Sequence, residues 1–142
     1  MIVTGDRDSL QLIDEHVTVK LVSSKLSQTV AVNYDPAKFR EEYGFDPIHL
    51  IDLKALMGDS SDNIPGVAGV GPKTATQLLL DYGTLDGVYA HLDAIKEKLR
   101  AKLEQGKDSA YLSYDLATIR CEAPIAFSPE ACLVQPYDEA AL

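Results

Sequence analysis

The stretch Gly66-Val67-Ala68-Gly69-Val70-Gly71-Pro72-Lys73 decides how this chain is organised. Its three glycines let the backbone take turn conformations and leave no side chain to block a close approach. The two valines between them can turn inward and hold the loop between its neighbouring segments. Proline at the first position of the following segment is typical of a helix start. We therefore predict a helix–hairpin–helix.

The end of this loop is also a predicted DNA-binding site. The first amides of the helix that starts at Gly71-Pro72-Lys73-Thr74 have no backbone partner, so they form an anion site, and Lys73 adds a positive charge. Such a loop grips a DNA phosphate and reads no sequence. The predicted DNA-binding residues are Gly66, Val67, Gly69, Val70, Gly71, Lys73 and Thr74. The alternative is an ordinary turn between two bundle helices.

The hairpin is in addition a candidate monovalent-cation site. In motifs of this kind the loop carbonyls, here those of Val67 and Val70, also hold an ion such as K⁺. That ion would then face the bound phosphate.

Two pairs of aspartates are candidate metal ligands. Asp6 and Asp8 follow a short predicted strand, where open α/β sheets place their sites. Asp59 and Asp62 are three residues apart at a helix end, so both carboxylates lie on one side of a turn. Carboxylate oxygens suit Mg²⁺ or Mn²⁺, and paired ions about 4 Å apart hydrolyse phosphodiesters. The alternatives are that Asp6 or Asp8 caps the next helix and that the second pair shapes a turn.

Composition limits the class of protein. The chain has 142 residues and a net charge of −9, which by itself disfavours DNA binding. However, five of the 13 basic residues lie within 96–107, so one face of the protein can be positive although its net charge is negative. The cysteines, Cys121 and Cys132, are not arranged for zinc. No apolar run reaches the length of a membrane span, and no signal peptide is recognisable, so we expect a cytoplasmic protein.

Local patterns predict a small β portion followed by helices. We expect a strand at Met1–Thr4, a short helix at 9–13, and a β-hairpin with strands 17–22 and 29–33 joined across Ser23–Gln28. The first strand belongs in a parallel sheet. The predicted helices are 36–43, 47–57, 72–81, 85–92, 95–104 and one that Asp108 caps and that ends near Ile119.

Three segments together resemble a known family. They are Ile2-Val3-Thr4-Gly5-Asp6-Arg7-Asp8-Ser9-Leu10-Gln11-Leu12, then Leu56-Met57-Gly58-Asp59-Ser60-Ser61-Asp62-Asn63-Ile64-Pro65-Gly66-Val67, then Gly69-Val70-Gly71-Pro72-Lys73-Thr74-Ala75. In order and spacing they are similar to the second half of the 5′-nuclease domain of bacterial DNA polymerase I, whose family includes 5′–3′ exonucleases and flap endonucleases. Tyr111–Ile119 resembles the late helix of that domain.

The resemblance implies a fold and a function. The fold would be the remnant of an α/β, PIN-like nuclease sheet in 1–45, a mostly helical helix–hairpin–helix region in 46–122, and an irregular tail in 123–142. Asp6, Asp8, Asp59 and Asp62 match the family's metal ligands, mainly those of its second ion. The implied activity is Mg²⁺- or Mn²⁺-dependent hydrolysis of DNA at 5′ ends and flaps, during primer removal and repair at the bacterial nucleoid.

The resemblance also implies that part of the family's site is missing. The family's first half supplies further acidic ligands, basic residues and the helical arch, and we expect a truncated chain with little nuclease activity alone. Its N-terminal strand would lack sheet neighbours and favour self-association. Two other functions stay open: a non-catalytic module that binds duplex DNA, and a helical domain whose acidic surface binds a basic protein.

Overall fold

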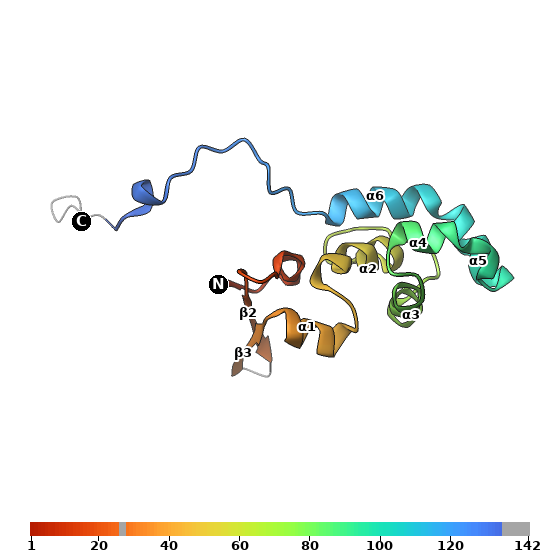
Figure 1. Cartoon of the computed structure of the whole chain (residues 1–142), viewed down its shortest axis with the longest axis horizontal. Coiled ribbons are helices and arrows are strands. Elements are labelled where there is room, and N and C mark those ends of the chain that lie inside the picture. Colours follow the sequence, from red (N-terminus) through yellow and green to blue (C-terminus); the bar gives the residue numbers. More distant parts are fainter. Residues whose placement is uncertain (26–27, 135–142) are drawn as a thin grey trace.

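The computed structural model describes residues 1–25 and 28–134, and Figure 1 shows their arrangement. The elements follow in the order β1 (Ile2–Thr4), η1 (Arg7–Leu12), β2 (Val19–Lys25), β3 (Gln28–Tyr34), α1 (Pro36–Tyr43), η2 (Pro47–His49), α2 (Leu50–Met57), α3 (Pro72–Tyr82), α4 (Leu85–Ala90), η3 (Leu92–Ala94), α5 (Glu97–Gln105), α6 (Lys107–Ala117) and η4 (Pro129–Cys132), where η marks a 3₁₀ helix. The predicted β portion followed by a helical region is confirmed.

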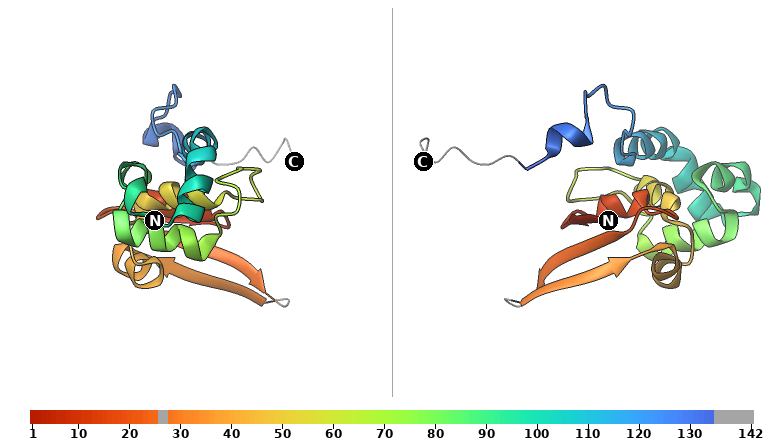
Figure 2. Two further views of the ribbon diagram at one scale, coloured as in Figure 1. Left: turned by 90° about the vertical axis from the view of Figure 1, so that its right-hand side faces the viewer. Right: turned by 60° about the vertical axis from the view of Figure 1, so that its left-hand side comes forward.

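The sheet has the order β1-β2-β3. β1 pairs with β2 in parallel, with Ile2 opposite Val19, which confirms the predicted parallel strand. The expectation that this strand lacks sheet neighbours is wrong on one side, because β2 covers that edge and only the outer edge of β1 stays open in the described sheet. β2 and β3 form the predicted hairpin and project from the body as a twisted ribbon (Figure 2). The predicted connection Ser23–Gln28 is too long, because Ser23 already pairs with Val30. The hydrogen bonds between strands are made by backbone groups, so Ser23 and Ser24 can continue β2 just as apolar residues would.

Helix starts follow their capping residues. The Asp35 side chain accepts a 2.7 Å hydrogen bond from the Lys38 amide and starts α1. The prediction that Asp108 caps the last helix is wrong. α5 and α6 meet at Gly106, whose amide donates to the Lys102 carbonyl and whose carbonyl accepts from the Ala110 amide. This shared residue starts α6 earlier and leaves Asp108 inside its first turn.

The centre of the molecule is α2. It is buried from Leu50 to Leu56 because α3, α4 and α6 pack around it (Figure 1). One apolar cluster runs from the β portion through this helix to α5, and its fully buried side chains include Leu10, Phe39, Leu56, Leu79 and Leu103. The core therefore fixes the point at which the loop after Met57 begins.

Gln11 joins the β portion to the far end of the helical region. Its side-chain amide donates to the carbonyl of Ala117, and its side-chain oxygen accepts from the amide of Ile119, both at 2.9 Å. The Gln11 side chain is buried, so these two bonds satisfy it at the carboxyl end of α6.

Residues 119–134 extend away from the body (Figure 1). Residues 123–134 are irregular apart from η4, and 135–142 of the predicted tail lie outside the described residues. In the part of the chain that the structure describes, no helix is long and apolar enough to cross a membrane.

Tyr34 makes the stability of this fold depend on pH in the alkaline range. Burial and the 2.8 Å hydrogen bond that its hydroxyl donates to Glu42 raise the pKa of Tyr34 to about 12 from 10.0. A raised pKa in the folded state contributes stability below pH 10, which is lost as the pH rises toward 12. Between pH 10 and 12 we expect the free energy of unfolding of this chain to fall as the pH rises. The slope of this fall should exceed that of Tyr34→Phe by about 1.4 kcal/mol per pH unit. Urea titrations across this range measure both slopes, and equal slopes would contradict the prediction.

Candidate functional site

The glycine-rich loop folds back onto the end of α2. Gly66 has a φ of 61°, and a Cβ on it would lie 2.2 Å from the backbone nitrogen of Gly58. The amide of Val67 donates to the carbonyl of Leu56 at 2.8 Å. Gly66 is therefore required both for its left-handed backbone and for the direct contact of two backbone segments.

The two valines of the loop point into the core, as predicted. Val67 and Val70 are only 2% and 4% exposed. The carbonyl of Val67 accepts a 3.0 Å hydrogen bond from the amide of Val70, so one predicted K⁺ ligand atom already has a protein partner. A carbonyl oxygen has two lone pairs, and one remains for a cation.

Two serines of α6 hold the loop from behind. The buried hydroxyl of Ser113 accepts from the amide of Gly66 at 2.9 Å, and the hydroxyl of Ser109 donates to the Gly66 carbonyl at 2.7 Å. Both polar groups of Gly66 are thereby satisfied, which fixes the loop against α6. The sequence carries no local signal for these contacts, because 43 or more residues separate the partners.

The amino end of α3 is open to a ligand. Its N-cap, Gly71, has no side chain to bond the first amides, and Pro72 occupies the first turn. Lys73 follows on the surface, and Thr74 is half-buried behind it. Free amides and a nearby ammonium form a site for an anion such as phosphate.

Three of the four predicted metal ligands meet in space. Asp8, Asp59 and Asp62 each offer a carboxylate oxygen, and these oxygens all lie within 4.8 Å of one another. Asp8 comes from η1 and the other two from the loop after α2, so the fold joins one member of the first predicted pair to both members of the second. Three oxygen ligands at this spacing suit a divalent cation.

Asp6 lies outside this trio. Its carboxylate accepts a 2.9 Å hydrogen bond from the amide of Asp8 and so caps η1. The capping alternative therefore holds for Asp6, while its role as a metal ligand stays a prediction.

Lys54 lies among the three carboxylates. Its side chain is only 6% exposed, and its Nζ contacts Asp8, lies 2.7 Å from Asp59 and lies 3.7 Å from Asp62. Sequence reasoning missed this residue. A single lysine in the otherwise apolar run Leu53–Met57 is the signal that could have found it, because a buried lysine requires an acidic partner.

The lysine acts differently on its two main partners. Burial raises the pKa of Asp8, and the neighbouring Lys54 offsets only part of this. Hydrogen bonds from Lys54 and Ser61 lower the pKa of Asp59 to about 2. Burial lowers the pKa of Lys54, but its hydrogen bonds to the two aspartates outweigh burial and raise it. The cluster thus holds a charged ammonium against at least one charged carboxylate.

A rigid loop connects the carboxylates to the hairpin. Asp59 and Ile64 exchange two backbone hydrogen bonds of 2.9 and 2.8 Å, and Gly58 has a φ of 74°. Because Gly66 packs directly on Gly58, the cluster and the hairpin are held at the same end of α2.

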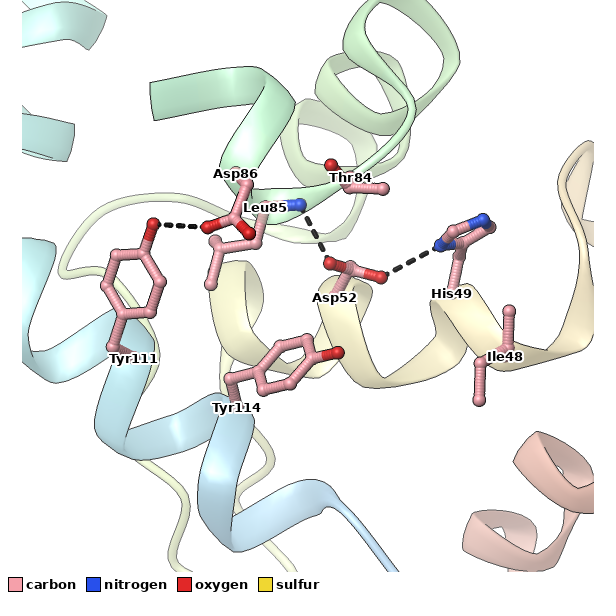
Figure 3. A pocket seen from close by; sticks show the side chains of 8 residues that line it. All are labelled: Ile48, His49, Asp52, Thr84, Leu85, Asp86, Tyr111 and Tyr114. Atoms are coloured by element: carbon pink, nitrogen blue, oxygen red, sulfur yellow. Dashed lines mark hydrogen bonds and ion pairs between the residues drawn. The ribbon is translucent and has the colours of Figure 1, made fainter. Parts of the chain in front are cut away.

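A separate pocket of about 250 Å³ lies on another side of α2, between α4 and α6 (Figure 3). Within it, the buried carboxylate of Asp52 accepts from the amide of Leu85 at 2.7 Å and lies 2.9 Å from the ring nitrogen of His49. This bond ties the start of α4 to α2. None of the predicted site residues lines this pocket.

Solved structures share this fold. A structure described as divalent metal ions (zinc) bound to T5 5′-exonuclease matches 81% of this chain and 41% of its own, with a TM-score of 0.64 and 23% identity. A T5 flap endonuclease complex with DNA and metal ions matches equally well.

Sequence relatives are polymerases. DNA polymerase I of Caldicellulosiruptor bescii is 51% identical over 125 residues, which are 88% of this chain, and that of Bacillus subtilis is 42% identical over 138 residues, or 96%. The chain spans only 15% and 16% of the length of these relatives.

Residues 45–140 match the family described as 5′-3′ exonuclease, C-terminal SAM fold. This segment contains α2, Asp59, Asp62 and the whole hairpin, so the match covers most of the geometry described above. The chain therefore belongs to the 5′–3′ exonuclease family.

Proposed function

We propose that this chain forms part of a metal-dependent 5′–3′ exonuclease or flap endonuclease that acts on DNA. The observation that carries the proposal is the cluster of Asp8, Asp59 and Asp62 around Lys54, locked to the glycine hairpin through the contact of Gly58 with Gly66. A nuclease needs a metal site and a duplex anchor at a fixed separation, and the carboxylate cluster and the hairpin would supply them. The matching T5 structures, described with metal ions and with DNA, support it.

The carboxylate cluster fits a divalent ion. Asp8, Asp59 and Asp62 supply hard oxygen ligands of the kind that Mg²⁺ and Mn²⁺ prefer, and Asp6, the residue that caps η1, would add a fourth. The ammonium of Lys54 already lies among these oxygens as a built-in cation, which supports the fit. The chemistry that such ions supply is water activation and charge stabilisation in phosphodiester hydrolysis.

The hairpin would hold the duplex next to this cluster. The open amides at the start of α3 and the ammonium of Lys73 would bind one phosphate, and Thr74 would add a hydroxyl. A K⁺ ion on the carbonyls of Val67 and Val70 would strengthen this site. The substrate would be chromosomal DNA in the cytoplasmic nucleoid, with primer removal and flap cleavage as the processes served.

We infer that the chain alone binds DNA better than it cleaves it. In the part of the chain that the structure describes, Lys54 is the one cation in ion-pair contact with the three clustered carboxylates. Their combined charge repels a phosphodiester unless metal ions neutralise it. A partner polypeptide carrying further basic residues would relieve the repulsion. Separately, the open outer edge of β1, where Val3 is 65% exposed, would favour self-association.

Binding tests the anchor. We expect the chain to bind a labelled duplex with a 5′ flap, and Lys73→Glu to weaken binding about tenfold or more, because a charge-assisted phosphate contact becomes a repulsion. Fluorescence anisotropy measures the affinity. Lys38→Glu is the matched control, since Lys38 lies on α1 and already pairs with Glu41 at 2.8 Å. Equal losses in the two variants would argue against a hairpin-specific site.

Metal titration separates the nuclease from its alternative, a non-catalytic module that binds duplex DNA. Calorimetry is expected to show Mn²⁺ binding, and Asp59→Asn and Asp62→Asn should each weaken it. The control is Asp46→Asn, which should leave Mn²⁺ binding unchanged because Asp46 is a surface residue on the N-terminal side of η2. DNA binding without any Mn²⁺ binding would favour the module. Strong flap cleavage by the chain alone, abolished in Asp59→Ala, would overturn the inference that it cleaves poorly.

A further inference from the structure

Lys102 reaches the glycine hairpin from a different helix. It lies in the last turn of α5, and its Nζ donates a 2.9 Å hydrogen bond to the carbonyl of Gly69. A Cβ added to Gly69 would lie 2.7 Å from this Nζ and 3.2 Å from the Cε. The lysine side chain therefore lies directly along the loop backbone, in the space that a side chain at position 69 would fill.

The ammonium of Lys102 has binding capacity left. It carries three N–H donors, and the carbonyl of Gly69 takes one. Among the ion pairs of the described residues, none involves Lys102, so its charge is held by a neutral carbonyl alone. It lines an open hollow of about 280 Å³ together with Ala68, Gln105 and Ser109, so a ligand has access.

The ammonium of Lys102 lies near the proposed phosphate site. Gly69 is two residues from Gly71, the uncapped start of α3, and two residues of chain span at most about 7 Å. Each strand of duplex DNA carries one phosphate per about 3.4 Å of helix axis, so the start of α3 and Lys102 are close enough to contact different phosphates of one strand. In a chain of net charge −9, two lysines at one loop make a local positive surface.

We propose that Lys102 is a DNA-binding residue that contacts the backbone phosphate next to the one held by Lys73 and the start of α3. This deepens the proposed function and rests on it. The hydrogen bond to Gly69 holds the ammonium in place before DNA arrives, so less side-chain freedom is lost on binding. The ligand class is the phosphodiester backbone of duplex DNA, read without regard to sequence.

Salt dependence of binding tests the proposal. Each phosphate contact contributes about 0.9 to the slope of log affinity against log salt. We expect Lys102→Gln to reduce this slope by about 0.9, so that its affinity deficit relative to the parent shrinks about threefold between about 50 and 200 mM salt. Lys102→Arg keeps the charge and is expected to keep the slope. Anisotropy with labelled duplex DNA measures all slopes.

The control comes from the same helix. Arg100→Gln removes an equal charge, but Arg100 already faces Glu104 at 3.9 Å, so its slope should match that of the parent. If Lys102 only tethers the loop, Lys102→Gln and Lys102→Met will lower thermal stability and weaken binding equally at every salt concentration, which overturns the proposal. An unchanged slope in Lys102→Gln overturns it while leaving the hairpin site intact. Failure of the parent chain to bind DNA overturns both.

Discussion

Gly66→Ala is expected to destabilise the chain by more than about 4 kcal/mol, the range reached only by severe backbone or core disruption. The added Cβ would lie 2.2 Å from the nitrogen of Gly58 and 2.6 Å from the carbonyl carbon of Met57. Both are backbone atoms at the end of buried α2, and neither can move without displacing the core. Urea denaturation followed by circular dichroism measures the loss.

Gly83→Ala separates steric overlap from backbone strain. Gly83 also has a positive φ, 82°, but a Cβ there would meet no atom within 4 Å. Gly83→Ala therefore carries only the cost of placing alanine in the left-handed backbone region, and we expect it to lower the free energy of unfolding by about 1 kcal/mol. If the two variants lose similar stability, the contact of Gly66 with Gly58 is not what holds the hairpin in place.

Lys54→Met is expected to lower the free energy of unfolding by about 3 kcal/mol or more when divalent metal is removed by a chelator. Methionine keeps most of the side-chain volume but leaves Asp8, Asp59 and Asp62 facing one another without a cation. Removing one partner of a buried charge cluster typically costs 3–5 kcal/mol. Lys38→Met, which breaks an exposed pair with Glu41, should leave the free energy of unfolding nearly unchanged.

Added metal should compensate for this loss. The ammonium of Lys54 lies among the same oxygens that would hold Mg²⁺ or Mn²⁺, so the two cations compete. Thermal unfolding is therefore expected to shift upward with Mn²⁺ more in Lys54→Met than in the parent, since binding to the folded state stabilises it. Identical shifts would show that Lys54 does not oppose metal binding at this cluster.

The elements that were predicted correctly are those that local chemistry controls. Asp35 followed by Pro36 starts a helix whatever lies around it, because the bonds involved are made within four residues. One error lies where two helices meet at a single residue. Asp108 has the chemistry of a cap, but the immediate junction of α5 with α6 at Gly106 leaves no place for one.

The candidate site could be predicted only in part. The i, i+3 spacing of Asp59 and Asp62 is visible in the sequence, but their meeting with Asp8 depends on how η1 packs against α2. Asp6 and Asp8 look equivalent in the sequence, yet the backbone directs one to cap η1 and the other to the cluster.

By itself, the sequence determined the glycine hairpin, the helix that starts at Pro72 and the presence of two carboxylate pairs, because turn conformations and helix starts depend on adjacent residues. Only the tertiary structure decided which side chains complete them. Lys54 enters the carboxylate cluster and Lys102 reaches Gly69 across 33 residues of chain, because helix packing brings them there. Contacts of that range arise from the shape of the whole core, which no local pattern encodes.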